Sequence, residues 1–137
     1  MILYNNRKVR VRTHRLVAGR AGRAGLRRGG TRGISMRIDE ILAQKRTLSF
    51  EVFPPKKGME ERDKLFSVID ELRELSPDFI SVTYGAGGSN SKNSVEIADY
   101  LQNRAQITAL AHITGGPSSP EDVTAVASAL RDRGVEN

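Results

Sequence analysis

From residue 47 onward, apolar and polar positions follow two alternating periods. Short runs rich in β-branched and aromatic residues are each followed by a longer stretch with apolar residues at helical spacing. The short runs predict strands at 47–53, 79–84 and 107–112, and the stretches predict helices at 59–75, 93–104 and 119–134. Strands and helices that alternate every thirty residues or so indicate βαβ units, and therefore an α/β fold with a parallel sheet.

Residues that interrupt regular structure lie at the predicted boundaries. Pro54 and Pro55 close the first strand, because proline cannot continue a strand ladder. Ser119 followed by Pro120 predicts the start of the last helix, with serine as N-cap and proline at the first helical position. Gly134 is placed to end that helix.

The length of the chain limits the architectures that it can complete. A doubly wound sheet and a (β/α)₈ barrel both fit three strand–helix units, but the chain has 137 residues and a barrel needs roughly 250. Residues 135–137 read as the first step into a fourth strand. We therefore expect residues 36–137 to be a fragment, with sheet edges left open.

The first 35 residues differ in composition from the rest. They hold ten of the 22 basic residues, six of the 13 glycines and no acidic residue, whereas residues 36–137 have a net charge of −4. So many glycines and so few large apolar residues predict a disordered extension. Three interpretations stay open: an RNA-binding Arg/Gly tail, a targeting segment, or a mis-assigned start site. In the third case residues 1–35 are no part of the working protein, which starts at Met36 with an amphipathic helix.

Several classes of protein are excluded by composition. There is no cysteine, so disulfide frameworks, thiolate nucleophiles and cysteine-based metal sites are ruled out. The two histidines, one of them in the extension, supply no metal-ligand set, and we expect no metal site. No run of eighteen apolar residues is present, so we expect no membrane span and, by default, a cytoplasmic protein.

Polar residues fall at the carboxyl ends of the predicted strands, where parallel α/β folds bind ligands. Glu51 lies near the end of the first strand, Thr83 and Tyr84 close the second, and His112 closes the third. An acid, a hydroxyl and an imidazole on one rim suit proton transfer and ligand contact. Each residue also has a simpler interpretation: Glu51 facing solvent or an arginine, His112 as a hydrogen-bonded structural residue, and Thr83 and Tyr84 as good strand formers.

Three segments resemble the first three strand motifs of the methylenetetrahydrofolate reductase family. They are SFEVFPPK at 49–56, FISVTYGAGGS at 79–89 and AHIT at 111–114. They occur in the order and spacing of the family, and the resemblance covers residues 36–137. Three motifs in register are far more specific than any one alone.

The resemblance implies a partial TIM barrel, the first three βα units of a (β/α)₈ fold, which binds FAD noncovalently at the carboxyl ends of its strands. It implies reduction of the flavin by NAD(P)H and then of 5,10-methylenetetrahydrofolate to 5-methyltetrahydrofolate. By position, Glu51 would be the general acid and Thr83 would lie near the nicotinamide or the flavin. Tyr84, Ala86 and His112 would contact FAD, and the intact protein would be a homo-oligomer.

The sequence departs from the family pattern in three places. Val52 stands where phenylalanine is usual, and Gly115-Gly116 stand where a cysteine is common. The next family motif, a Leu-Arg-Gly-Asp strand end that grips the flavin, would begin just beyond Asn137. We therefore expect the chain alone not to turn over.

Overall fold

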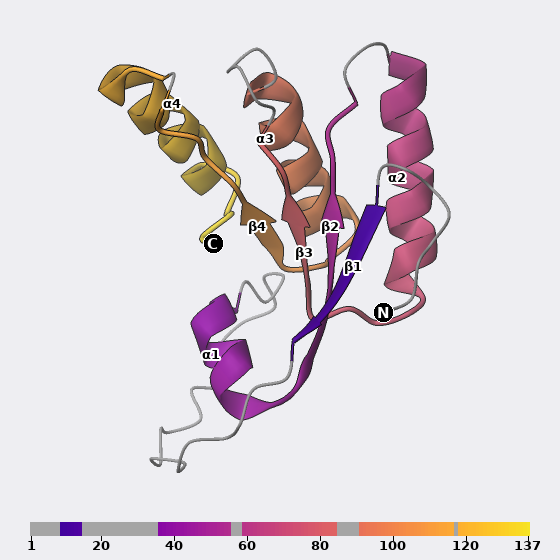
Figure 1. Cartoon of the computed structure of the whole chain (residues 1–137). Coiled ribbons are helices and arrows are strands. Elements are labelled where there is room, and N and C mark those ends of the chain that lie inside the picture. Colours follow the sequence, from indigo (N-terminus) through magenta and orange to yellow (C-terminus); the bar gives the residue numbers. More distant parts are fainter. Residues whose placement is uncertain (1–8, 15–35, 56–58, 85–90, 117) are drawn as a thin grey trace.

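The computed structural model describes residues 9–14, 36–55, 59–84, 91–116 and 118–137. Its centre is a four-stranded sheet with the strand order β1-β2-β3-β4 (Figure 1). The strands are β1 (Val9–His14), β2 (Thr47–Val52), β3 (Phe79–Val82) and β4 (Ala109–Ala111). The helices are α1 (Ile38–Gln44), α2 (Met59–Arg73), α3 (Ser91–Asp99), which continues into the π-helical turn η1 (Tyr100–Arg104), and α4 (Pro120–Arg131).

The three predicted strand–helix units are confirmed in order and type. β2 pairs with β3 and β3 with β4, both parallel, and α2 and α3 make the two crossovers. The predicted start of the last helix is confirmed in detail, because the Ser119 hydroxyl accepts the Asp122 N–H and Asp122 reaches back to the Ser119 N–H. Gly134 follows the helix with φ +72°, which only glycine adopts at little cost.

The main hydrophobic core lies between one face of the sheet and helices α2, α3 and α4. Because side chains alternate between the two faces of a strand, Phe50 and Val52 of β2 share this face with Ile80 and Val82 of β3. Each helix contributes apolar residues from one side. They are Leu65, Ile69 and Leu72 of α2; Val95, Ile97 and Ala98 of α3; and Leu130 of α4. All three later helices therefore cover the same face of the sheet.

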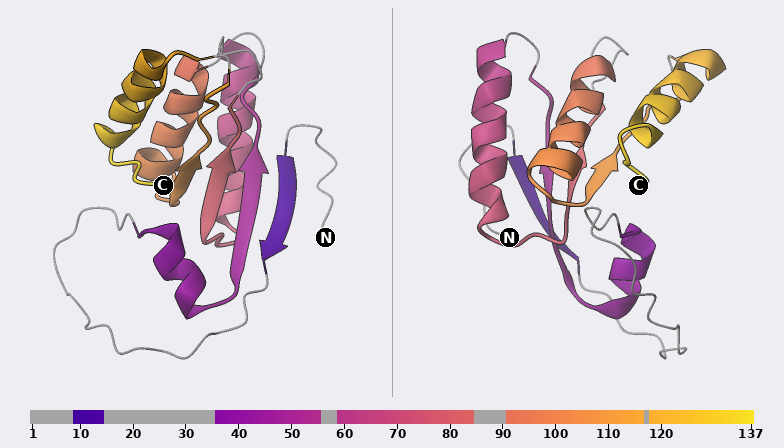
Figure 2. Two further views of the ribbon diagram at one scale, coloured as in Figure 1. Left: turned by 60° about the vertical axis from the view of Figure 1, so that its left-hand side comes forward. Right: turned by 180° about the vertical axis from the view of Figure 1, so that it is seen from behind.

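Helix α1 packs on the opposite face, next to the strand starts (Figures 1 and 2). Its buried residues Ile38 and Ile41 form a second, smaller cluster with Phe79 of β3, and Leu110 of β4 packs against it. The sequence predicted an amphipathic helix from Met36, and this is confirmed. α1 thus covers one end of this face of the sheet, called the inner face below, and leaves the other end to polar residues; the face beneath α2, α3 and α4 is called the outer face.

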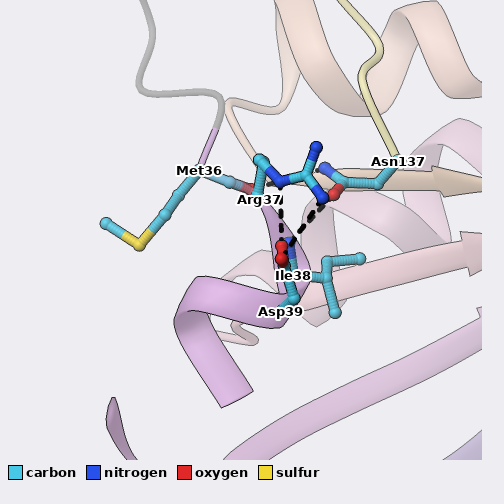
Figure 3. Close-up of polar contacts among 5 residues, drawn as sticks. All are labelled: Met36, Arg37, Ile38, Asp39 and Asn137. Carbon is cyan, nitrogen blue, oxygen red and sulfur yellow. Dashed lines mark hydrogen bonds and ion pairs between the residues drawn. The ribbon is translucent and has the colours of Figure 1, made fainter. Parts of the chain in front are cut away.

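A single side chain ties the start of α1 to the end of the chain. The Asn137 side chain accepts the Ile38 N–H through Oδ1 at 2.9 Å and donates through Nδ2 to the Met36 carbonyl at 3.4 Å (Figure 3). The Asn137 carbonyl also accepts the N–H of Ala111, so the segment runs beside β4. Because the N-cap residue Arg37 offers no side-chain cap, Asn137 takes that place from a hundred residues away.

Strand β1 differs from the expectation of a disordered extension over residues 1–35. Residues 9–14 pair antiparallel with β2 along its whole length, from Val9 opposite Val52 to His14 opposite Thr47 (Figure 2). The physical reason is local: Val9, Val11 and Thr13 are β-branched residues at alternate positions, and the outer edge of β2 offers unpaired backbone groups. Residues 1–8 and 15–35 lie outside the described part of the chain.

Candidate functional site

The carboxyl ends of β2, β3 and β4 meet at one edge of the sheet. Backbone pairing continues past the assigned strand ends there: the Thr83 N–H donates to the Val52 carbonyl, and the His112 N–H donates to the Val82 carbonyl, each at 3.0 Å. Glu51 lies opposite Ser81 in the parallel register. Glu51, Thr83 and His112 are therefore brought to one edge, as the sequence predicted.

The carboxyl group of Glu51 is held by the hydroxyl group of Thr83. Thr83 Oγ1 donates a hydrogen bond to Glu51 Oε1 at 3.0 Å, and both side chains are half-buried. Within residues 36–55, 59–84, 91–116 and 118–137, no basic side chain forms an ion pair with this carboxylate. In the antiparallel register of β1 and β2, Arg10 is the residue opposite Glu51, so the interpretation that Glu51 meets an arginine stays open.

Glu51 and His112 line one small cavity on the inner face. Its volume is about 150 Å³, and its lining residues are Ser49, Phe50, Glu51, Phe79, Ser81, Leu110 and His112. Ser49 and Ser81 are buried hydroxyl-bearing residues, and Ser81 Oγ donates to the Phe50 carbonyl at 3.3 Å. His112 is exposed at the rim. The inner face is therefore polar towards the strand ends and apolar only beside α1.

The other predicted site residues are placed as follows. Tyr84 follows Thr83 and is buried, with 8% of its surface exposed, and it is not among the described residues that line the cavity. Ala86 lies in the segment 85–90, outside the described residues. The predicted contacts of Thr83, Tyr84, Ala86 and His112 with a cofactor stay predictions.

Three serines near the site were missed by the sequence reasoning. Ser49 and Ser81 each lie two positions before a predicted site residue, Glu51 and Thr83, and a period of two puts them on the same face. That spacing was the available signal. Ser94, in α3, donates from Oγ to the Thr83 carbonyl at 3.4 Å, and no sequence pattern announced this contact.

Two larger cavities lie away from this edge. One of about 420 Å³ lies between α3 and α4, and one of about 460 Å³ lies between α1 and the starts of β3 and β4. Neither is lined by a residue that the sequence predicted for the site. In parallel α/β proteins the starting ends of the strands serve stability, so the chemistry of this chain is best sought at the smaller, polar cavity.

Within the described ranges, no group of three or more His, Asp or Glu side chains is arranged to hold a metal ion. No helix in that same part of the chain has the length and apolarity needed to cross a membrane.

Comparison with known proteins identifies the family. The family model described as methylenetetrahydrofolate reductase matches residues 37–137. Methylenetetrahydrofolate reductase (NADH) 1 of Arabidopsis thaliana is 34% identical over 104 residues, which are 74% of this chain and 17% of that protein. The 5,10-methylenetetrahydrofolate reductases of Escherichia coli (strain K12) and Pectobacterium carotovorum are 31% and 35% identical over 90 and 91 residues.

These matches cover much of this chain and little of its relatives. The two bacterial alignments span 66% of the chain and 30% of each bacterial protein. The matched region includes Glu51, Thr83 and His112 and begins just before α1. The chain belongs to the methylenetetrahydrofolate reductase family.

Proposed function

We propose that this chain supplies the first three strand–helix units of a flavin-dependent enzyme that reduces 5,10-methylenetetrahydrofolate to 5-methyltetrahydrofolate with NAD(P)H. The observation that carries the proposal is the Glu51–Thr83 hydrogen bond at the shared strand-end edge. It places a carboxyl group where parallel α/β folds bind ligands, in a chain that belongs to this family.

A (β/α)₈ barrel is the architecture that we propose for the whole protein. In a doubly wound sheet, helices cover both faces, whereas in a barrel they lie outside and the inner face of the sheet is enclosed. The helices that follow the strands, α2, α3 and α4, all pack on one face here. The short helix α1 lies on the other face at the strand starts, and the strand-end part of that face carries Ser49, Glu51 and Ser81. The packing of all three strand-following helices on one face favours the barrel over the doubly wound sheet.

The residues at the polar edge fit part of an FAD site. Small inner-face side chains, Ser49 and Ser81, leave room for a flat ring above the sheet, and the exposed imidazole of His112 can hydrogen-bond to it. Bound flavin supplies the hydride chemistry, and the protein orients the reactants. Thr83, Tyr84, Ala86 and His112 are the residues that we propose to lie at this cofactor.

Glu51 is the general acid in this proposal. The folate substrate carries its methylene carbon in a five-membered ring between two nitrogens. When Glu51 donates a proton to one ring nitrogen, the bond from that nitrogen to the carbon breaks and the carbon becomes an electrophilic iminium. Proton donation from a positioned carboxyl group typically accelerates such a step by a factor of about 10² to 10⁴.

The chain alone is proposed not to turn over. Pockets that bury a small-molecule ligand typically have about 300–1,000 Å³, and the cavity at Glu51 has about 150 Å³. Three strands therefore offer only part of a flavin-sized site. The match to only 30% of the Escherichia coli enzyme supports the same proposal.

The other expectations stay open. The RNA-binding alternative rests on the basic residues of 1–35, most of which lie outside the described residues, and nothing observed favours it. A cytoplasmic location and assembly into a homo-oligomer remain predictions. The Arabidopsis relative carries NADH in its name, so NADH is the first reductant to test.

The test uses the native protein that carries this chain, purified whole. We expect its intact mass to exceed 15.1 kDa, its visible spectrum to show flavin, and its two half-reactions to be measurable: NADH oxidation with a quinone acceptor, and reduction of methylenetetrahydrofolate. Glu51→Gln should preserve quinone-linked NADH oxidation and lower folate turnover at least 100-fold. Equal loss of both half-reactions, or a protein without flavin, would overturn the proposal.

A further inference from the structure

We infer that Thr83 is a positioning residue for Glu51: it holds Oε1 of the carboxyl group and leaves Oε2 as the oxygen that delivers the proton. This inference rests on the proposed function, because it concerns how the proposed acid is aimed. It gives Thr83 this role in addition to the cofactor contact proposed above.

Thr83 is itself fixed through its backbone and its side chain. Its N–H donates to the Val52 carbonyl at 3.0 Å, and its carbonyl accepts Ser94 Oγ at 3.4 Å, so β2 and α3 hold it from two sides. Its χ1 torsion is further restricted because threonine is β-branched. The hydroxyl group is therefore presented in one direction, and that direction is the Glu51 carboxyl group at 3.0 Å.

The hydrogen bond from Thr83 restricts a flexible side chain. The half-buried side chain of Glu51 has three rotatable bonds, and the Thr83 hydroxyl group donates to its carboxyl group. A glutamate side chain that is not tethered keeps several rotamers, and fixing it costs conformational entropy. The threonine hydroxyl offsets part of that cost before substrate binds.

The contact also distinguishes the two carboxyl oxygens. A hydroxyl group has a single hydrogen, and Thr83 uses its hydrogen on Oε1. The proton of the neutral acid then resides on Oε2, which is the oxygen left for the substrate nitrogen. For the same reason, while this bond is made Thr83 can accept a hydrogen bond from a bound ligand but cannot donate one.

The first test compares Thr83→Val with Thr83→Ser in the native protein. Valine keeps the shape and loses the hydroxyl group, whereas serine keeps the hydroxyl group. We expect Thr83→Val to lower kcat for folate reduction about 10- to 100-fold, the cost of a misplaced catalytic group, and to lower it more than quinone-linked NADH oxidation, which does not use the Glu51 proton. Thr83→Ser should restore kcat to within about threefold of wild type.

The second test needs no turnover and uses the 137-residue chain. With ¹³C-labelled glutamate, NMR side-chain couplings report whether Glu51 occupies one rotamer, and a deuterium isotope shift on its carboxyl carbon reports the Thr83 hydroxyl. We expect one rotamer and an isotope shift in wild type and Thr83→Ser, and rotamer averaging without the shift in Thr83→Val. Should Thr83→Val not fold, Thr83→Ala replaces it, and circular dichroism checks both.

The outcomes separate the two proposals. Unchanged folate turnover in Thr83→Val, equal loss of both half-reactions, or failure of serine to rescue would overturn the positioning role. If the wild-type protein does not reduce methylenetetrahydrofolate, the proposed function fails. The NMR result then still decides whether Thr83 orders Glu51, and rotamer averaging in the wild type would overturn the inference.

Discussion

The two faces of the parallel sheet are built from alternate residues of the same strands, and they differ in chemistry. On the outer face, Phe50 and Val52 of β2 meet Ile80 and Val82 of β3 beneath three helices. The inner face carries Glu51 on β2 and, just past the ends of β3 and β4, Thr83 and His112. Glu51 and Thr83 are each adjacent in sequence to an apolar core residue of the outer face. A shift of one position along a strand therefore changes a core residue into a site residue.

This difference assigns stability and chemistry to opposite sides of one sheet. The outer face removes large apolar side chains from water, which is the main favourable term in folding. The inner face carries hydroxyl, carboxyl and imidazole groups whose net contribution to folding is small, because water satisfies them equally well in the unfolded chain. Substitutions on the two faces should consequently have effects of different kinds.

The largest loss of stability is expected for Phe50→Ala. Phe50 is 4% exposed and lies in the core between β2 and the helices. Removing its ring should lower the free energy of unfolding by about 3–5 kcal/mol, through lost transfer energy and the cavity left behind. Urea unfolding of the chain measures this change. The exposed Ser67→Ala in α2 is the control and should stay within about 0.5 kcal/mol of wild type.

Much of the outer face could be predicted from the sequence. Leu65, Ile69 and Leu72 recur at helical spacing, and the strand at 79–84 is an unbroken β-prone run, so periodicity alone indicated which residues would be buried. The same patterns placed Glu51 and Thr83 at strand ends and thus at one edge. Parallel pairing of strands that lie about thirty residues apart in the sequence brings these carboxyl ends together.

Contacts between segments far apart could not be predicted in this way. Glu51 and Thr83 are 32 positions apart, and that their side chains touch depends on the exact register of β2 against β3. The contact of Asn137 with the start of α1 spans 99 positions, and an asparagine near a chain end carries no signal of its own. Strand β1 was not predicted, because the high glycine and arginine content of residues 1–35 indicated disorder and outweighed the alternation of β-branched and basic residues over six positions.

An intermediate loss is expected for Asn137→Ala, on the inner side. The Ile38 N–H would lose its acceptor in a half-buried place, which costs about 1–2 kcal/mol in unfolding free energy. Asn137→Asp keeps an oxygen at the helix start and should lose less. Amide hydrogen exchange at Ile38 localises the effect. Unchanged exchange at Ile38 in Asn137→Ala would show that α1 is held by Ile38, Ile41 and Phe79 alone.

A smaller effect, confined to alkaline pH, is expected at the rim of the outer face. Burial, together with the hydrogen bond that Tyr100 donates to Asp70 at 2.9 Å, raises the pKa of Tyr100 above its usual value. The folded state therefore holds the phenol proton more tightly than the unfolded state. The resulting stabilisation is complete below the unfolded pKa of about 10 and is lost as pH rises through the higher folded pKa.

Tyr100→Phe isolates this contribution. Phenylalanine keeps the ring that stacks on Phe66 at a centroid distance of 4.0 Å and removes the ionisable group. Above about pH 10, we expect the unfolding temperature of the wild type to fall more steeply with pH than that of Tyr100→Phe. The difference in unfolding temperature between the two proteins should therefore narrow. Thermal unfolding from pH 8 to 11 measures both slopes, and parallel slopes would contradict the assignment.

The smallest effect on stability is expected for Glu51→Gln, the immediate neighbour of Phe50. Glutamine keeps an oxygen that can accept the Thr83 hydroxyl, and Glu51 contributes no apolar surface to the core. Its unfolding free energy should stay within about 0.5 kcal/mol of wild type, measured in the same urea experiment as Phe50→Ala. A loss above about 1 kcal/mol would mean that the polar, strand-end part of the inner face also supports the fold. Near-equality with wild type would mean that this carboxyl group is dispensable for folding, which leaves its chemistry as the reason for its place on the strand.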